Sequence, residues 1–308
     1  MPKLSSKKDC KNAIAIIRGG SKDGEFVYFD ESNKNEPVLK VENLYDLVSD
    51  KKVRSQKKYM SLDEMMKLKV AFETGNIQED IKEIYDKLKP EVQKAQHNHI
   101  KLNDGQFELV PLIKENQVQK IMVAGMSGVG KSTIISHYAE NYKKLFPKNR
   151  IIIISRHDED PVLDKIKGIK RIKLNDEILE AEIDLSDMAQ SLVIMDDIDT
   201  IPDKRINKLI ANLRDDLLEN ARHHNIYMCC VSHQLLNFRT TRHLLLECDS
   251  IIFFPKSGGY QIKRFLKEYA SLEREQVQTI MKLPSRWICL NKNTYPNTII
   301  SETDILIL

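Results

Sequence analysis

The chain has 308 residues, 41% of them hydrophobic and 30% charged, which suits one large domain or two modest ones with a buried core. Lys and Arg number 48 against 45 for Asp and Glu, so the formal net charge is +3. This balance excludes a histone-like or polybasic nucleic-acid binder but leaves room for a local basic surface.

The start of the sequence is not typical of a secretory signal peptide. Its first residues, MPKLSSKKDC, lack the apolar core of a signal peptide, and no apolar run approaches the ~18–20 residues of a membrane span. We therefore expect neither secretion nor membrane insertion. The five cysteines are scattered, without a C-x-x-C pair. A zinc site or disulfide framework is not expected, and free thiols fit a reducing compartment.

Residues 1–115 predict a small α+β appendage without visible chemistry. The apolar runs Ala13–Ile17 and Phe26–Phe29 flank a glycine-containing polar loop, which is typical of a β-hairpin. The segment Lys51–Lys58 carries five positive charges, and it is either a solvated loop or a contact to a phosphate backbone. Ser61 and Glu64 have capping-box spacing at the start of a Met-rich helix that breaks near Gly75. A second helix is expected over Ile81–Lys89, ended by Pro90.

From residue 116 to residue 308 the pattern changes to apolar strands that alternate with amphipathic helices, the clearest of which is Asn207–Ala221. Continuous apolar runs fit strands that are buried on both faces of a parallel sheet. Strand–helix alternation predicts an α/β domain with a mainly parallel sheet flanked by helices. The expected strands are Lys120–Ala124, Ile151–Ile154, Leu192–Met195, Ile226–Val231 and Ser250–Phe254.

The segment GMSGVGKS, which starts at Gly125, matches the phosphate-binding pattern G-x-x-x-x-G-K-[ST] between a predicted strand and a predicted helix. Its glycines let the backbone N–H groups face an anion, and the helix N-terminus adds a favourable dipole. Lys131 is expected on the β- and γ-phosphates and Ser132 on Mg²⁺. A glycine-rich turn that merely joins strand to helix is the alternative. The expected nucleotide-binding residues are Gly125, Ser127, Gly128, Val129, Gly130, Lys131, Ser132 and Thr133.

A second motif, LVIMDDID, places two carboxylates after an apolar strand. We assign Asp196 to Mg²⁺ and Asp197 to polarising the attacking water, a role that the longer Glu often fills. Asp199 is expected to serve the loop, and a solvated acidic turn is the alternative for the whole motif. The strand Ile151–Ile154 lies between the two motifs, which favours an additional-strand ATPase over kinase-like and GTPase-like proteins. The lack of an N-K-x-D motif argues against GTP.

From about Val118 onward the chain resembles FtsK/HerA-class DNA-pumping ATPases, and in particular the genome-packaging ATPases of nucleocytoplasmic large DNA viruses. The resemblance rests on SRHDED, LVIMDDID, NARHHNIYMCCVSH, TTRHLLLECDSIIFFPKS and SRWICLNKNTYP. It implies a polar sensor at His233 or Gln234, where S-H-Q stands in place of the T-Q of bacterial translocases. It also implies an arginine finger that acts on a neighbouring subunit, with Arg222, Arg239 and Arg242 as candidates.

The resemblance implies an ATP- and Mg²⁺-dependent motor that moves double-stranded DNA, works as a homo-oligomeric ring and packages a viral genome. Virion or capsid components would be its partners, in the host cytoplasm (a viral factory) or in the virion. Because the charge is nearly balanced, an NTP-dependent switch or assembly scaffold that does not act on DNA remains the alternative. A small-molecule kinase is disfavoured by the extra strand and the paired Asp motif.

Overall fold

The computed structural model describes residues 3–7, 11–30, 61–86, 89, 99–181, 183–237, 240–294 and 296–308. The predicted basic segment Lys51–Lys58 and the candidate finger Arg239 lie outside the described residues, as do Cys10 and Pro90. Within the described residues, no helix is both long enough and apolar enough to cross a membrane.

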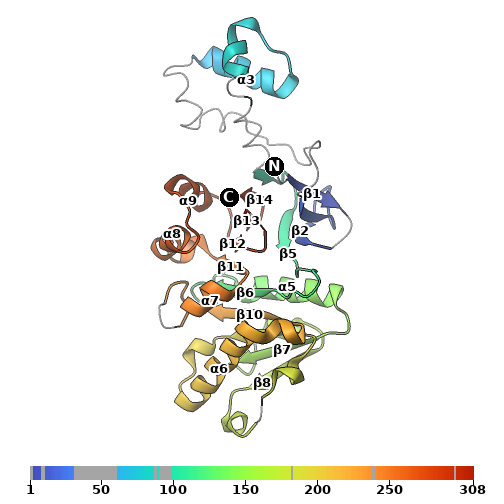
Figure 1. Ribbon diagram of the computed structural model, residues 1–308, viewed down its shortest axis with the longest axis vertical. Coiled ribbons are helices and arrows are strands. Elements are labelled where there is room, and N and C mark those ends of the chain that lie inside the picture. Colours follow the sequence, from blue (N-terminus) through green and yellow to red (C-terminus); the bar gives the residue numbers. More distant parts are fainter. Residues whose placement is uncertain are drawn as a thin grey trace.

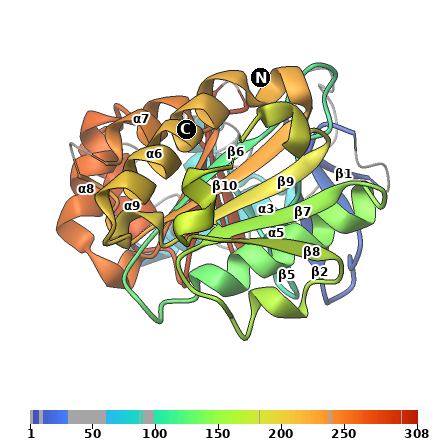
Figure 2. The same cartoon turned by 90° about the horizontal axis from the view of Figure 1, so that it is seen from below.

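One sheet of ten strands forms the centre of the molecule (Figures 1 and 2). The strands from β8 to β11 pair in parallel, and those from β11 to β4 pair antiparallel. This arrangement confirms the predicted α/β class with a mainly parallel sheet. In spatial order the strands are β8 (Ile169–Lys173), β7 (Arg150–Ser155), β9 (Ser191–Asp196), β10 (Ile226–Ser232), β6 (Lys120–Ala124), β11 (Ser250–Phe253), β12 (Ile288–Asn291), β13 (Thr298–Ser301), β14 (Asp304–Ile307) and β4 (His99–Lys101).

The inner parallel strands are mostly apolar because helices cover both of their faces, whereas the edge strand β8, with the sequence IKRIK, has no buried residue. Every residue of β9 and β10 is buried. Figures 1 and 2 show α5 (Lys131–Leu145) on one face and α6 (Lys204–Asn220) on the other. In α6 the buried residues Ile206, Ile210, Leu213 and Leu217 recur at helical spacing. The remaining α-helices of the carboxyl-terminal half are α7 (Arg242–Glu247), α8 (Gly259–Glu268) and α9 (Arg274–Met281).

The strand that separates the two motif-bearing strands is not the one predicted. Ile151–Ile154 does form a strand, β7, but it pairs with β8 and β9 on the far side of the acidic strand. The strand inserted between β6 and β9 is β10, which follows the acidic motif in the sequence. The sheet therefore has an additional strand, as predicted, but this strand is β10 and not β7. Parallel strands are joined by crossover connections, so a strand that comes later in the sequence can lie between two earlier ones.

The amino-terminal segment forms a second sheet, in the order β1 (Lys3–Lys7), β3 (Phe26–Asp30), β2 (Ala13–Arg18) and β5 (Gln106–Leu109). The predicted hairpin is confirmed, since β2 and β3 pair antiparallel. This sheet packs on the larger one: Ile14, Ala15 and Ile17 belong to the same apolar core as the parallel strands. Since β4 pairs in the large sheet and β5 in the small one, the boundary between residues 115 and 116 stays a prediction.

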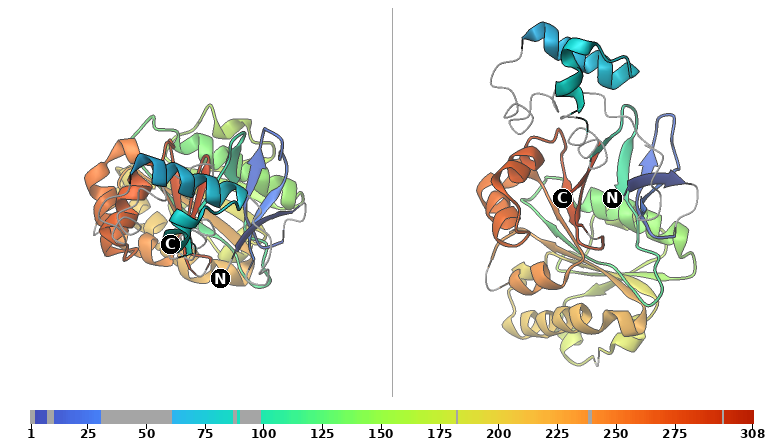
Figure 3. Two further views of the ribbon diagram at one scale, coloured as in Figure 1. Left: turned by 90° about the horizontal axis from the view of Figure 1, so that it is seen from above. Right: turned by 45° about the horizontal axis from the view of Figure 1, so that its top comes forward.

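The helix α3 (Leu62–Thr74) lies beyond both sheets at one end of the molecule (Figures 1 and 3). Its predicted capping box is present: the Glu64 N–H donates to Ser61 Oγ at 3.2 Å, and the Ser61 N–H donates to Glu64 Oε2 at 2.9 Å. Gly75 ends the helix with a φ of 78°. The helix predicted over Ile81–Lys89 starts as a 3-10 turn, Glu79–Ile81, and is described to residue 86.

Candidate functional site

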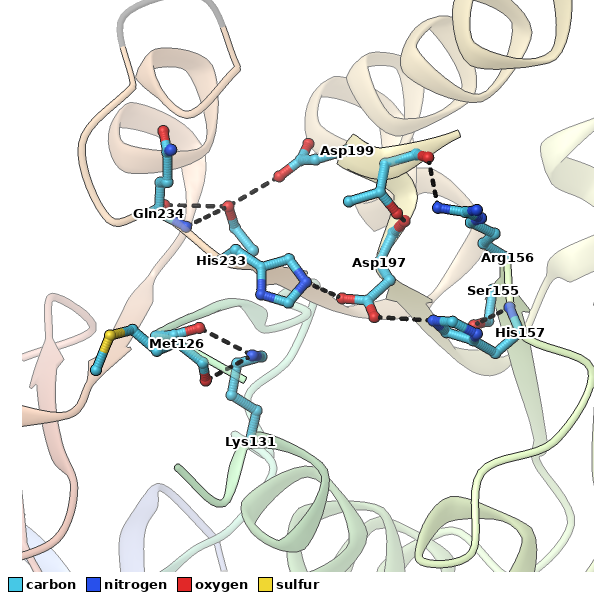
Figure 4. Close-up of polar contacts among 12 residues, drawn as sticks. Met126, Lys131, Ser155, Arg156, His157, Asp197, Asp199, His233 and Gln234 are labelled. Atoms are coloured by element: carbon cyan, nitrogen blue, oxygen red, sulfur yellow. Dashed lines mark hydrogen bonds and ion pairs between the residues drawn. The ribbon is translucent and has the colours of Figure 1, made fainter. Parts of the chain in front are cut away.

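The carboxyl ends of four neighbouring parallel strands meet at one edge of the large sheet. Ala124 of β6 pairs with Ser232 of β10, and Asp196 of β9 pairs with Ser155 of β7. The loops that follow these strands carry both sequence motifs and the SRHDED segment, so they face one another (Figure 4). In parallel sheets ligands bind in this position, beyond the carboxyl ends of the strands.

The loop after β6 curls as a phosphate-binding loop requires. Gly128 and Gly130 have φ values of 77° and 106°, a backbone region that favours glycine. Gly125 is needed for space, because a Cβ there would lie 2.7 Å from a ring carbon of Phe254. The loop ends at Lys131, the first residue of the 15-residue helix α5, whose N-terminal N–H groups favour an anion.

The Lys131 ammonium group lies back over its own loop (Figure 4). It donates to the carbonyl oxygens of Gly125 at 2.8 Å and of Met126 at 3.0 Å, and the residue is 9% exposed. Burial lowers the pKa of Lys131, and the nearby charges of Asp197 and Asp196 oppose this effect. In this arrangement the Lys131 ammonium group is bound to its own loop, and it would have to leave these two carbonyl oxygens to contact an anion.

Ser132 contacts a carboxylate that the sequence analysis left unassigned. Its hydroxyl donates to Asp160 Oδ2 at 3.2 Å. The other oxygen of Asp160 accepts from the N–H groups of Val162 and Leu163, each at 2.8 Å, so the carboxylate is anchored in its loop. The available signal was the polar segment SRHDED directly after an apolar strand, but its place beside Ser132 depends on the position of β7 next to β9.

Asp196, at the end of β9, is 8% exposed. Burial raises the pKa of its carboxyl from 3.8 to about 6, and the negative charges of Asp197 and Asp160 add to the shift, against Lys131 and His157. A cation bound next to Asp196 would stabilise the ionised carboxylate and so lower its pKa again.

Asp197 lies between two imidazole rings (Figure 4). His233 Nε2 is 2.8 Å from Asp197 Oδ1, and His157 Nε2 is 3.3 Å from Asp197 Oδ2. Asp197 also has a φ of 53°, an uncommon backbone conformation for a residue other than glycine. The carboxylate is thus held by its backbone and by two side chains, of which His157 was not predicted.

The two candidate sensors have different surroundings. His233 contacts Asp197, whereas the exposed Gln234 accepts from Asn237 Nδ2 at 2.9 Å through its side-chain oxygen. Asp199, which was expected to serve its own loop, accepts a hydrogen bond from the Ser232 hydroxyl at the end of β10, at 2.9 Å. Of the two candidates, the structure brings His233 to the paired carboxylates.

The two candidate arginines within the described residues belong to different elements. Arg222 belongs to the 3-10 turn Ala221–His224, which precedes β10 and so stands at the amino edge. The seven residues of β10 separate it from the phosphate-binding loop by roughly 20 Å at ~3.3 Å per residue. Arg242 is exposed and begins α7, after β10. Arg222 cannot reach the site of its own chain, so any role at a nucleotide would have to be in another subunit.

The oxygen donors at the site suit a magnesium ion that shares its ligands with a nucleotide. In the described part of the chain, no group of three or more His, Cys, Asp or Glu side chains is arranged to hold a metal alone. Mg²⁺ commonly takes one or two protein oxygens together with substrate phosphates and waters. The Ser132 hydroxyl and the buried Asp196 carboxylate fit this pattern, with Asp160 beside Ser132.

Comparison with known proteins identifies a viral relative. Protein V3 of Sputnik virophage, described as uncharacterized, is 38% identical over 208 residues, which cover 67% of this chain and 82% of that protein. The chain belongs to the family of this virophage protein. No family model matches the chain.

Similar solved structures include two viral packaging enzymes and a conjugation protein. The genome packaging NTPase B204 of Sulfolobus turreted icosahedral virus 2, in complex with AMPPCP, has 17% identity and a TM-score of 0.41, over 59% of this chain and 97% of that one. The DNA-packaging ATPase B204 of Sulfolobus turreted icosahedral virus has 18% identity, the same TM-score and the same coverage. The pCW3 conjugation coupling protein TcpA has 12% identity and a TM-score of 0.41, over 94% of this chain and 77% of that one.

Proposed function

We propose that the chain is a Mg²⁺-dependent ATPase that translocates double-stranded DNA and packages a viral genome. The observation that carries the proposal is the meeting of Lys131, Asp196 and an Asp197–His233 pair at the carboxyl edge of one sheet. A phosphate-binding loop opposite two successive carboxylates supports hydrolysis of a nucleoside triphosphate. Membership of a virophage protein family supports a viral setting.

In this proposal the loop N–H groups and Lys131 bind the β- and γ-phosphates of ATP, with Thr133 and the rest of Gly125–Ser132 around them. Ser132 and Asp196 would hold Mg²⁺, which when bound neutralises charge on the phosphate oxygens. Loss of the Lys131 contacts to Gly125 and Met126 would free its ammonium group for the phosphates.

Asp197 would orient the attacking water and accept its proton, while the water oxygen bonds to the γ-phosphorus and the bond to ADP breaks. His233 and His157 keep the carboxylate in place, because one imidazole contacts each of its oxygens. His233 would thereby couple the state of the γ-phosphate to the loop that follows β10.

We propose the homo-oligomeric ring that the resemblance implies, in which Arg222, at the edge of the sheet away from the site of its own chain, could serve a nucleotide only across a subunit boundary. Such an arginine stabilises charge in the transition state. DNA affinity would come from phosphate contacts and should fall steeply with salt. Virion or capsid components are the proposed partners, and the host cytoplasm or the virion is the proposed location.

The proposal is tested by ATP turnover with and without long duplex DNA, and by mass determination with nucleotide bound. We expect Mg²⁺-dependent hydrolysis that duplex DNA stimulates, together with an oligomer. Hydrolysis that duplex DNA leaves unchanged over a range of salt concentrations would favour the NTP-dependent switch or assembly scaffold instead.

A further inference from the structure

The helix α8 carries a row of positive charges on its exposed face. Tyr260, Lys263, Arg264 and Lys267 follow one another at intervals of three, one and three residues, a spacing that places them on one side of a helix. All four are exposed, and Tyr260 is 79% exposed. Figures 1 and 2 show α8 on the outside of the molecule. We call these four residues the α8 stripe.

The other side of α8 is fixed in the core. Ile262, Phe265 and Leu266 are buried and belong to the same apolar core as the strands of the large sheet. The ring centroid of Phe265 lies 5.9 Å from that of Phe253, the last residue of β11. Because its apolar side is already buried, α8 cannot use that side to enter a lipid bilayer or the hydrophobic groove of a partner. The helix therefore offers a ligand mainly its charge.

The positive charge of the stripe is concentrated and mostly uncompensated. Residues 254–267 contain four Lys and Arg and no Asp or Glu, in a chain whose formal net charge is only +3. Arg264 donates to Glu268 at 2.8 Å, and among the described residues Lys263 and Lys267 have no ion pair. Lysine is depleted from protein–protein interfaces, whereas Lys and Arg gathered along one helix are typical of a nucleic-acid contact.

The length of the stripe suits the backbone of one DNA strand. Seven residues separate Tyr260 from Lys267, which corresponds to about 10 Å along the helix axis at ~1.5 Å per residue. Successive phosphates of one strand advance by ~3.4 Å along the duplex axis, so the stripe spans about three of these steps. Each of the three cations can meet a phosphate group, and the Tyr260 hydroxyl can donate to another.

The chain that leads into α8 packs on the phosphate-binding loop. The strands β11 and β6 pair in parallel and end at the same edge of the sheet. A Cβ on Gly125 would lie 2.7 Å from a ring carbon of Phe254 and 3.3 Å from Ser257 Oγ. The 3-10 turn Pro255–Ser257 joins these contacts to α8. A rearrangement of the loop would therefore act directly on the turn that precedes the stripe.

We propose that the α8 stripe contacts the phosphate backbone of duplex DNA. The inference rests on the proposed function in one respect, because it takes duplex DNA as the partner. It assigns to this partner a surface that lies outside both sequence motifs. Since the stripe shares no residue with the proposed nucleotide site, the two can be altered separately.

Two variants of the full chain that lose the same charge test the proposal. The test variant replaces the three cations of the stripe, and the control variant replaces three exposed lysines on and just before β8, at the far edge of the large sheet. The substitutions are Lys263→Gln, Arg264→Gln and Lys267→Gln in the test variant and Lys165→Gln, Lys167→Gln and Lys170→Gln in the control variant. Affinity for a labelled duplex is measured by fluorescence anisotropy over about 50–200 mM salt, with Mg²⁺ and a non-hydrolysable ATP analogue.

The salt dependence of duplex binding is the decisive quantity. Each lost phosphate contact reduces the slope of log affinity against log salt by about 0.9, so the test variant should lose about 2.7. Its affinity should fall at least about ten-fold at the lowest salt concentration. The control variant should keep the slope and should bind within about two-fold of the unsubstituted chain, because charges far from the DNA are screened.

Equal slopes in the test and control variants would overturn the proposal. So would a test variant that fails to assemble while its slope stays unchanged, because the stripe would then contact a second copy of the chain. If circular dichroism shows that the test variant does not fold, the single variants Lys263→Gln and Lys267→Gln decide. Each should reduce the slope by about 0.9, and an unchanged slope in both would refute the stripe.

ATP turnover separates this inference from the proposed function. Without DNA, the test variant should hydrolyse ATP as the unsubstituted chain does, but it should lose the stimulation by duplex DNA. Full stimulation of the test variant would refute the stripe and leave the motor intact. Duplex binding that depends on the stripe, without any stimulation of the unsubstituted chain, would support the stripe and refute the motor. Failure of the unsubstituted chain to bind duplex DNA at any salt concentration would refute both.

Discussion

Replacing Asp196 by Asn should stabilise the nucleotide-free protein while impairing its proposed metal site. The carboxyl is buried, and its pKa is raised from 3.8 to about 6, chiefly by loss of hydration. A group whose pKa is raised on folding contributes its full stability below the unfolded value and loses it as the pH rises through the folded value. Ionised Asp196 therefore opposes folding at pH 7 and above, and Asn, of nearly the same size, removes that opposition.

The expected gain in the free energy of unfolding follows from the raised pKa of Asp196. The pKa rises by rather more than two units, and each unit corresponds to about 1.4 kcal/mol, so the gain at pH 8 is about 3 kcal/mol as an upper value. At pH 5 the folded carboxyl is mostly protonated while the unfolded one is ionised, so the advantage of Asn falls to roughly half of that. Asp196→Asn should thus gain stability over the unsubstituted chain, and the gain should grow between pH 5 and pH 8.

Urea unfolding in EDTA, without nucleotide, measures this difference at both pH values. Asp187→Asn is the matched control, because Asp187 is exposed and the same substitution should leave the stability nearly unchanged at either pH. An Asp196→Asn protein that is no more stable than the unsubstituted chain at pH 8 would refute the reasoning, as would a gain that does not decrease toward pH 5. In turnover assays the same variant should need more Mg²⁺.

Four further predictions concern turnover. Lys131→Ala should abolish hydrolysis and weaken ATP binding while circular dichroism shows an intact fold, and normal turnover would remove Lys131 from the mechanism. Asp197→Asn should bind ATP but lower the single-turnover rate by a factor of at least about 100; if Asp196→Asn is slow and Asp197→Asn is normal, another base such as Asp199 acts. His233→Ala should lower the maximal rate far more than Gln234→Ala does, because His233 contacts Asp197 whereas the Gln234 side chain contacts Asn237, and the opposite order would make Gln234 the sensor. The three arginine-finger variants are Arg222→Ala, Arg239→Ala and Arg242→Ala. At least one of them should hydrolyse ATP slowly alone and recover partial activity when it is mixed with Lys131→Ala. Normal rates in all three variants, or mixtures that stay inactive although assembled, would exclude a trans-acting arginine.

The sequence was sufficient for the elements whose patterns are local. The strand ahead of Gly125, the helix after Lys131 and the acidic strand that ends at Asp196 all lie where their apolar runs and motif spacing predict. The capping box at Ser61 was equally visible, because it involves residues only three positions apart. Each of these features depends on residues that are close together in the sequence.

What the sequence did not reveal depends on the order of strands in the sheet. His157 and Asp160 reach the site only because β7 lies beside β9, and β10 lies between β6 and β9 although it follows both in the chain. The short strands β12, β13 and β14 have four residues each, too few for a periodic signal.

Whether ATP hydrolysis moves this protein along duplex DNA, as proposed, is tested most directly by displacement of a labelled third strand from a duplex. We expect displacement that requires both ATP and Mg²⁺, slows as the duplex between the loading end and the third strand is lengthened, and is lost with Asp197→Asn. Sustained ATP hydrolysis on the same DNA without displacement would contradict translocation, and so would displacement that proceeds equally without ATP.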